Sequence, residues 1–524
     1  MRTFLRTFCL RTFCFMMPIL VSLFCYQSAF AYHDINANEL TNLCTNSLLI
    51  EKVVALEDKD GESNTPLVLA PGQQRPTYAY VKCSNVSSGQ ASTAGSAAGA
   101  IEGDHKVIFI QGVSGQPLNI KGEFDYSINI TADSVTIGEA LFKKGVKLKS
   151  NSLIIERATT FWDDSVIITE TALKVNNAVV IDAKKQLLLS VVNGKFENAG
   201  TVTADTLGVK SKKIIGHLNS ILSASKKITI SGFDDFLNHS STMASGGDII
   251  ISGGSGEGLF SGLIRNIGKP KIFANGVYSL QCDYINDTAE TYARIGAILN
   301  SNNEINFSSS ASLTTDMLVV KSPRFVMDRN CQLMAYDLAN IVVSDNRNMG
   351  IYDLADIKGR ILVNQNSPAH FDSILRAKPW IPSSYISQSV ASPLTARFSR
   401  YPMGFRLSAK TNISARSSLF QSDSGIYIQG KKSVTLDGLI INSPREIRTS
   451  VLSIDADSAV VKGELNSSNG ILIATKHELD VLADLHSEAD IKLSGSDIVI
   501  GGALNADSLI SAAASASLTA LADS

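Results

Sequence analysis

Short runs in which apolar and polar residues alternate recur along most of this chain. Examples are ADTLGV at 204–209, SKKITIS at 225–231, GGDIIIS at 246–252 and ANGVYSL at 274–280. Alternation with a period of two residues is typical of β-strands, whose neighbouring side chains point to opposite faces. A helix would need apolar residues at i, i+3, i+4 and i+7 over ten or more positions. Such spacing is found at most near Leu479 to Leu485, so the pattern predicts an all-β protein.

The alternating runs belong to a longer repeat, which is marked by asparagine. Asn177, Asn198, Asn219, Asn238, Asn266 and Asn286 follow one another at spacings of 21, 21, 19, 28 and 20 residues. After each asparagine comes a polar run and then a short apolar strand. The interval of 28 residues contains an additional segment, SGGSGEGLFSG. The same rhythm returns between Val451 and the last residue, at about 19 residues per repeat.

A period near 20 residues, built from runs of three to five residues, is typical of one turn of a parallel β-helix. We therefore expect a right-handed single-stranded parallel β-helix, a solenoid, with a small N-terminal cap region. Roughly 16 to 18 turns stacked at about 4.8 Å would make a rod on the order of 80 Å long. Inward Ile, Leu and Val should form apolar columns, and the repeated asparagine should pass amide hydrogen bonds from turn to turn. Gly246 and Gly247 should let the backbone bend between two strands.

Several of these phrases resemble a known family. FENAGTVTAD, FLNHSSTMASGGDIIIS, YINDTAETYARIGAIL and IKLSGSDIVIGGALNAD are similar to the haemagglutinin-type repeats of filamentous haemagglutinin and other two-partner-secretion exoproteins. The resemblance covers roughly residues 130–365 and 420–524. It implies a long right-handed β-helix presented at the bacterial surface for adhesion, aggregation or toxin delivery, exported with an outer-membrane partner. The N-terminal part lacks the NPNG-like motifs of that family's secretion domain.

The chain divides into five expected segments. Residues 1–31 have the features of a signal peptide: Arg2, Arg6 and Arg11, an apolar stretch, and Ala29-Phe30-Ala31 before the expected cleavage at Tyr32. Residues 32–105 are expected to form a cap and linker, and 106–365 the first part of the β-helix. An irregular basic and aromatic insertion is expected at 366–417, and the β-helix should continue over 418–524. The last phrase, LTALADS, predicts either a continuation or a partner that covers it.

The mature chain would carry a formal charge of 44 − 49 = −5, so charge as a whole does not favour nucleic acid or anionic membranes. No apolar segment after residue 31 is long enough to span a bilayer. Cys44 and Cys83 could pair or remain two thiols; both alternatives stay open. Cys282 and Cys331 lie 49 residues apart, roughly two and a half turns, so we expect them to stay reduced.

Catalytic chemistry is not indicated by any motif. The seven histidines are scattered, and we expect no metal site and no cofactor. Asp163-Asp164 and Asp234-Asp235 are adjacent carboxylates, which on a strand would point to opposite faces, so turns are the better interpretation. Acidic groups clustered on one face across neighbouring turns would instead favour a carbohydrate-active enzyme.

One segment departs from the neutral background. Between Arg376 and Arg416 the chain has seven basic residues and no acidic one, with aromatic residues interspersed. Guanidinium groups and aromatic faces suit acidic sugars or another polyanion. The expected ligand-binding residues are Arg376, Lys378, Trp380, Arg397, Arg400, Tyr401 and Arg406. The alternative is a loop folded back on the solenoid with its aromatic residues buried.

These features predict a secreted or surface-exposed bacterial β-helix protein, an adhesin-like presenter of binding loops without catalysis, with the periplasm as the alternative location. The expected partners are an acidic glycan or other polyanion and an outer-membrane secretion partner, but no specific nucleic acid. Two alternative functions remain open. One is a carbohydrate-active β-helix enzyme, a lyase or hydrolase, and the other is a purely structural spacer or assembly subunit.

Overall fold

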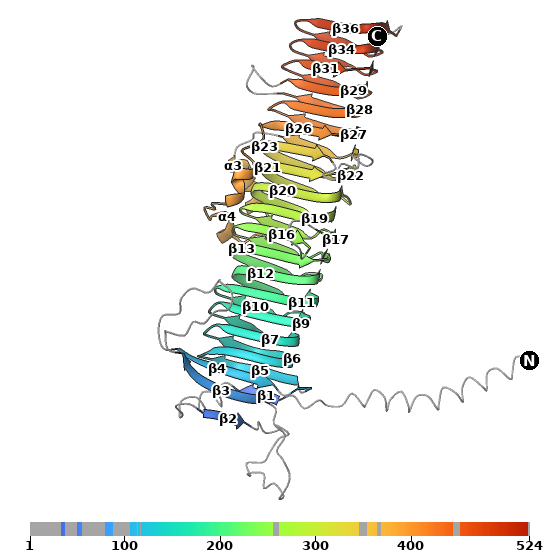
Figure 1. Ribbon diagram of the computed structural model, residues 1–524. Helices are drawn as coiled ribbons and strands as arrows, with labels where there is room; N and C mark the ends of the chain where they lie inside the picture. The colour runs from blue at the N-terminus through green and yellow to red at the C-terminus, as the bar shows by residue number, and fades with distance from the viewer. Residues whose placement is uncertain are drawn as a thin grey trace, which may run out of the picture.

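The protein is a parallel β-solenoid of about 18 stacked turns, as the sequence pattern predicted (Figure 1). The computed structural model describes residues 33–36, 50–54, 79–86, 105–112, 114–115, 117–254, 261–344, 354–363, 368–443 and 451–521. The expected signal peptide at 1–31, Cys44 and most of the Ser/Gly/Ala-rich linker lie outside these residues. The pairing of Cys44 with Cys83 therefore stays a prediction.

Strands at the N-terminal end differ from the rest in direction. They are β1 His33–Asn36, β2 Ile50–Val54, β3 Ala79–Val86 and β4 His105–Gly112. β3 pairs antiparallel with β2 on one side and with β4 on the other, while β1 pairs parallel with the first solenoid strand, β5 Pro117–Phe124, and β4 pairs parallel with β6. Among the described residues, antiparallel pairing is confined to this end of the chain, and the expected cap stays a prediction.

All the pairings that follow are parallel. The strands before the insertion are β6 Ser127–Phe142, β7 Val146–Ile155, β8 Thr159–Phe161, β9 Ser165–Val175, β10 Val180–Ala183, β11 Gln186–Asn198, β12 Thr201–Gly216, β13 Ile221–Phe233, β14 Asp235–His239, β15 Thr242–Ser245, β16 Asp248–Gly253, β17 Leu263–Ile267, β18 Lys271–Ala274, β19 Val277–Asp287, β20 Glu290–Phe307, β21 Ser312–Ser322, β22 Arg324–Met327, β23 Gln332–Val343, β24 Leu354–Ile357 and β25 Arg360–Val363. The strands after it are β26 Gly404–Ala409, β27 Asn412–Ser422, β28 Ile426–Asn442, β29 Leu452–Val461, β30 Leu465–Ser467, β31 Ile471–Thr475, β32 Glu478–Val481, β33 Leu485–Ser487, β34 Ile491–Ile500, β35 Leu504–Ala506 and β36 Ile510–Ala520.

One turn consists of three strand segments, and a bend connects each segment to the next. β14, β15 and β16 form such a turn, and β17, β18 and β19 stack on them in register. The additional segment expected at SGGSGEGLFSG lies between β16 and β17, where residues 255–260 are not described. The segment with a trace of helical spacing, Leu479 to Leu485, spans β32 and the start of β33, so that spacing does not mark a helix.

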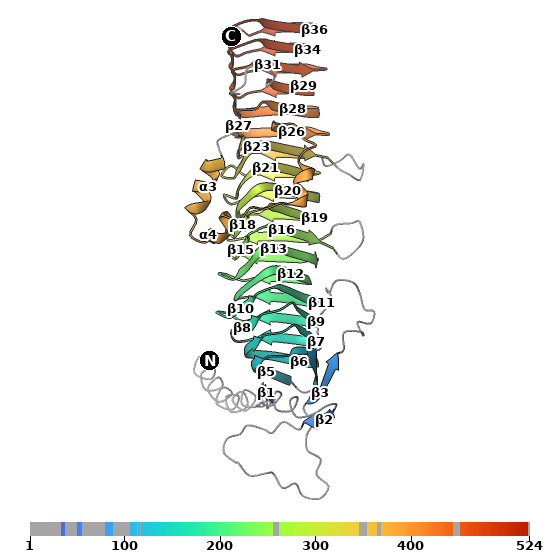
Figure 2. The same cartoon turned by 90° about the vertical axis from the view of Figure 1, so that its left-hand side faces the viewer.

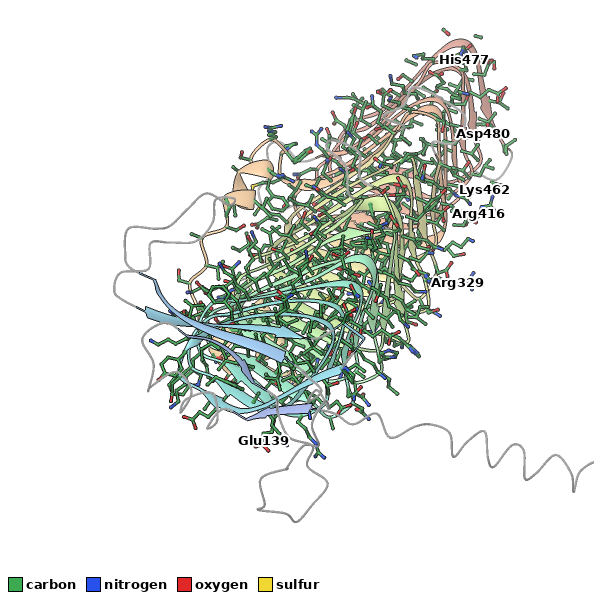
Figure 3. The ribbon with its side chains drawn as sticks, turned by 60° about the horizontal axis from the view of Figure 1, so that its bottom comes forward. Glu139, Arg329, Arg416, Lys462, His477 and Asp480 are labelled. Atoms are coloured by element: carbon green, nitrogen blue, oxygen red, sulfur yellow. The ribbon has the colours of Figure 1, made fainter. Side chains whose placement is uncertain are left out.

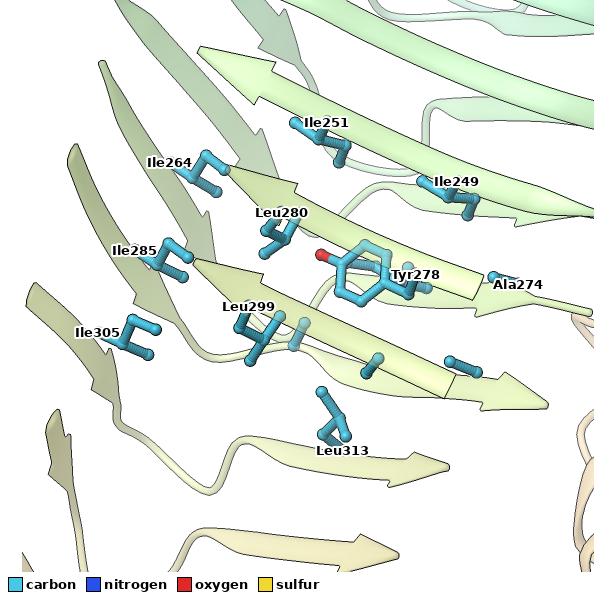
Figure 4. Packing of buried hydrophobic residues seen from close by; sticks show 14 of the residues in the cluster. Ile249, Ile251, Ile264, Ala274, Tyr278, Leu280, Ile285, Leu299, Ile305 and Leu313 are labelled. Atoms are coloured by element: carbon cyan, nitrogen blue, oxygen red, sulfur yellow. The ribbon is translucent and has the colours of Figure 1, made fainter. Parts of the chain in front are cut away.

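The interior is one continuous apolar column. Ile249 and Ile251 of β16 are fully buried, Ile250 between them is half-buried, and Leu280 stacks directly on Ile251 (Figure 4). Aromatic rings stack in the same way near the N-terminal end, where the centroids of Phe124 and Phe142 are 5.0 Å apart. Alternation along each strand thus becomes a ladder of like side chains along the axis.

A ladder of buried polar side chains runs along the interior, but only some of the repeated asparagines belong to it. Asn198, Asn238 and Asn266 are buried at equivalent positions, with Gly216 between the first two. Asn266 donates through Nδ2 to Asp287 Oδ1 of the next turn at 2.9 Å. Burial raises the pKa of Asp287, and hydrogen bonds from Asn266 and the Ala289 amide oppose that shift.

The other three asparagines of the repeat, Asn177, Asn219 and Asn286, are exposed, so their expected place in the ladder was wrong. Asn219 has a φ of 63° in a turn, which asparagine tolerates better than most residues. Cys282 and Cys331 are both buried and free, and burial is the main cause that raises the pKa of the Cys282 thiol to about 12.

Candidate functional site

The insertion stands at one corner of the solenoid, between β25 and β26. Val363 ends β25 opposite Ala335, and Gly404 begins β26 opposite Leu338. In the turn below, only Tyr336 and Asp337 lie between those two positions. The described part of the insertion, residues 368–403, contains α3 Pro368–Arg376, α4 Ser383–Ile386 and the 3₁₀ helix η1 Pro393–Arg397. We call it the strap, because it extends along the corner over earlier turns (Figure 2).

The irregular segment is shorter than expected. The sequence predicted it to continue to residue 417, but β26 and β27 are solenoid strands in full parallel register with β23 and β24. Lys410 and Arg416 therefore belong to the solenoid, where Arg416 lies on its outer surface (Figure 3). A proline-rich composition had hidden the point at which regular pairing resumes.

Apolar side chains on the underside of the strap bury an apolar stripe of the solenoid. Phe371 and Leu375 of α3 pack against Phe273, Tyr292 and Tyr336, the last three from stacked strands. The ring centroids of Tyr336 and Phe371 are 5.2 Å apart. The side chains at these three solenoid positions face outward, where polar residues are usual. An outward apolar patch of this kind is typical of a surface that another part of the protein covers.

A second apolar contact fixes the returning part of the strap. Phe398 is buried against Val277, Ile298 and Val319 on the outer side of β19, β20 and β21. A Cβ on Gly296 would lie 2.3 Å from Cζ of Phe398, so only glycine leaves room for the ring. Glycine at this corner position is thus matched to the strap.

Hydrogen bonds and an ion pair also connect the strap to the solenoid corner. Arg294, at the corner of β20, donates to the carbonyl oxygen of Ile386 at 2.6 Å and lies 3.1 Å from the carboxylate of Asp372 in α3. Asn275 Nδ2 donates to the Gln388 carbonyl at 3.0 Å. One solenoid arginine therefore joins the two α-helices of the strap, α3 and α4, to the corner.

The first part of the strap has a further charged contact. Lys378 Nζ lies 2.5 Å from Oε1 of Glu290 and 5.3 Å from the centroid of the Tyr292 ring. The carboxylate of Glu290 raises the pKa of Lys378 through this hydrogen bond. At the far end of the strap, the hydroxyls of Tyr385 and Ser223 are 2.8 Å apart. Contacts to the solenoid therefore extend over several turns.

The structure separates the seven expected ligand-binding residues into two groups. Lys378, Trp380 and Tyr401 face the solenoid: Lys378 pairs with Glu290, Trp380 packs near Tyr292 with centroids 6.3 Å apart, and Tyr401 packs beside Phe398. Arg406 is a half-buried residue of β26 whose guanidinium carbon lies 5.0 Å from the Tyr427 ring. These four residues have partners within the protein, and their expected role in ligand binding stays a prediction.

Arg376, Arg397 and Arg400 form the other group. All three are exposed, and within the described part of the chain none of them forms an ion pair. The strap has four basic residues and one acidic residue, a net charge of 4 − 1 = +3. Because Lys378 and Asp372 are paired with the solenoid, the three exposed arginines carry that excess. We call them the arginine surface.

Carboxylates also gather at the corner beneath the strap. Asp316 lies at the corner of β21, between Thr315 and Met317, and Asp337 lies at the corner of the next turn. Burial and then the charge of Asp337 raise the pKa of Asp316 to about 7; Asp372 adds to the shift and Arg294 opposes it. In turns nearer the N-terminus, where no strap contact is seen among the described residues, the same corner holds ion pairs such as Asp163 with Lys185, 2.7 Å apart.

The remaining sequence candidates are structural. Asp163 and Asp164 lie in a turn, and Asp163 pairs with Lys185 at 2.7 Å; Asp235 pairs with Arg265 at 2.7 Å. Among the described residues, no group of three or more His, Cys, Asp or Glu side chains could hold a metal ion. Over the same residues, no helix has the length and apolar character needed to cross a membrane.

Comparisons of this chain with protein-family models, with curated proteins and with solved structures gave no match. The resemblance to haemagglutinin-type repeats therefore stays an expectation.

Proposed function

We propose that this chain is a secreted or surface-exposed, non-catalytic β-helix protein that presents the arginine surface to an acidic glycan or another polyanion. The observation that carries the proposal is the division of the strap. Its apolar side chains are used to hold it on the solenoid, while Arg376, Arg397 and Arg400 point to solvent without carboxylate partners among the described residues.

The chemistry of arginine supports this choice of ligand. A guanidinium stays charged at any physiological pH and can donate two parallel hydrogen bonds to a carboxylate or sulfate group. Trp380 and Tyr401 are partly buried against the solenoid, so the arginines are the side chains of the strap that are most open to a ligand. Recognition should therefore depend on charge and weaken as salt rises. Export by a signal peptide, and an outer-membrane secretion partner, belong to the same proposal.

Replacing Arg376, Arg397 and Arg400 together with alanine should weaken binding to dextran sulfate by about ten- to a hundredfold. The three side chains are exposed, so the melting temperature should stay close to that of the parent. Binding is measured by calorimetric titration at two salt concentrations, with uncharged dextran as the ligand control.

A matched protein control removes three other exposed cations. Lys184, Lys195 and Lys476 lie on the solenoid and pair with Asp182, Glu197 and Asp457 of their own or neighbouring strands. Their triple alanine variant should bind dextran sulfate as the parent does. Equal losses in both variants would mean that binding follows total charge, and the arginine surface would have no special role.

One observation favours a carbohydrate-active enzyme as a second candidate. Asp316 and Asp337 lie on adjacent turns, which are about 4.8 Å apart in a stacked sheet, close to the separation of about 5 Å in retaining glycosidases. A carboxyl with a pKa of about 7 suits a general acid. Release of reducing ends from an acidic polysaccharide, abolished in Asp316→Asn, would replace the binding proposal with this one.

A further inference from the structure

Asp316 lies where the solenoid and the strap meet. The charged and titratable groups around it are Arg294 of β20, Tyr336 and Asp337 of β23, and Asp372 of α3. Arg294 is shared, because its guanidinium also donates to the Ile386 carbonyl and lies beside Asp372. One cation therefore acts both on Asp316 of the solenoid and on Asp372 of the strap.

This arrangement favours the protonated form of the Asp316 carboxyl when the strap is docked. Burial, Asp337 and Asp372 raise the pKa of Asp316 to about 7, from an ordinary value of 3.8. The pKa of Asp337 is also raised, by burial first and then by Asp423. Tyr336 does not ionise near neutral pH, since burial and Asp316 raise its pKa to about 12. Undocking removes Asp372 from the corner and returns water to it, which lowers the pKa of Asp316, while Asp337 of the solenoid stays beside it.

We propose that the strap is a pH-sensitive latch, held firmly on the solenoid corner while the Asp316 carboxyl is protonated and loosened when that carboxyl ionises. The latch rests on the corner geometry and is independent of the proposed polyanion binding. The pKa of Asp316 is higher in the docked state than in the undocked state, so docking is strongest while the carboxyl is protonated in both states and weakens as pH rises towards 7. Above about pH 7 it levels off, because both states are then ionised.

The two tryptophans of the chain make a direct measurement possible. Trp162 is 49% exposed on the solenoid, whereas Trp380 is in the strap, near Tyr292. In a Trp162→Phe background Trp380 is the sole tryptophan, and acrylamide quenching of its fluorescence reports its exposure. Between about pH 5 and about pH 7.5 the docking constant should fall by up to tenfold per pH unit, so quenching should rise and then reach a plateau.

Asp316→Asn in the same background should give low quenching that does not change over this range, because the amide imitates the protonated acid. Asp337→Asn removes a like charge, lowers the pKa of Asp316, and should move the rise to lower pH. Asp163→Asn changes a carboxylate at the same corner, paired with Lys185 and away from the strap, and should leave the curve unchanged. His370→Gln controls for a histidine of α3 whose side chain is not described.

The quenching of Trp380 in the Trp162→Phe protein is corrected for the pH dependence of free tryptophan. If the corrected quenching is constant from about pH 5 to about pH 8.5, the proposal is overturned. A rise that persists unchanged in Asp316→Asn, or that disappears in His370→Gln, would also overturn it. If Asp316→Asn does not fold, the Asp337→Asn curve decides: a shift to lower pH supports the latch, and an unshifted curve contradicts it.

Discussion

Replacing Ile251 with aspartate should destabilise the solenoid by at least about 4 kcal/mol, the largest effect that we expect from a single substitution. Ile251 is fully buried, and it stacks between Ile230 and Leu280 of the neighbouring turns. The substitution removes those apolar contacts and places a carboxylate among the buried apolar side chains of the column. Thermal melting followed by circular dichroism measures the loss.

The neighbouring residue is the control for this prediction. Ile250 is half-buried and points to the outer side of the same strand, so Ile250→Asp should cost about 1 kcal/mol or less. Equal melting temperatures for the two variants would show that β16 does not have one buried face, and the assignment of the interior would be incorrect.

A methyl group at Gly247 should be almost as harmful, with an expected cost of about 3 kcal/mol. A Cβ there would lie 1.9 Å from the carbonyl oxygen of Lys226 in the turn below. Backbone atoms of a stacked turn cannot move aside as a flexible side chain can. Gly247→Ala should therefore separate two turns locally, which chemical denaturation would detect as a lower midpoint.

Gly138→Ala is the matched substitution. A Cβ at Gly138 would have its nearest neighbour, the Cβ of Lys121, at 3.5 Å, an ordinary contact distance. The free energy of unfolding of this variant should stay within about 0.5 kcal/mol of that of the parent protein. A similar loss in both variants would mean that the effect comes from glycine in general and not from the close approach of two turns.

The solenoid could be predicted from sequence because its cause is local. Alternation in runs such as GGDIIIS determines which side chains point inward, and a period near 20 residues determines the turn. The exact ladder was less accessible. Asn177 and Asn198 look alike in sequence, yet only Asn198 is buried, because a residue type does not reveal on which side of a bend its side chain lies.

The strap shows a different limit. Its composition was evident, but whether Trp380 binds a ligand or packs depends on residues more than 80 positions earlier, such as Tyr292. Two signals could have helped: aromatic residues at outward strand positions, as at Phe273 and Tyr292, and glycine recurring at one corner, as at Gly246 and Gly296. Either alone has an ordinary explanation, and only their coincidence at one corner indicates a covered surface.

Modification of arginine by a dicarbonyl reagent, followed by mass spectrometry, tests most directly whether the strap has a packed underside and a free basic surface. Arg376, Arg397 and Arg400 should react quickly in the free protein and become protected by dextran sulfate. Arg294, which is bonded to Ile386 and Asp372, should react slowly with or without the polymer. Rapid modification of Arg294 would contradict the packed strap, and arginines at 376, 397 and 400 that dextran sulfate leaves unprotected would contradict the binding surface.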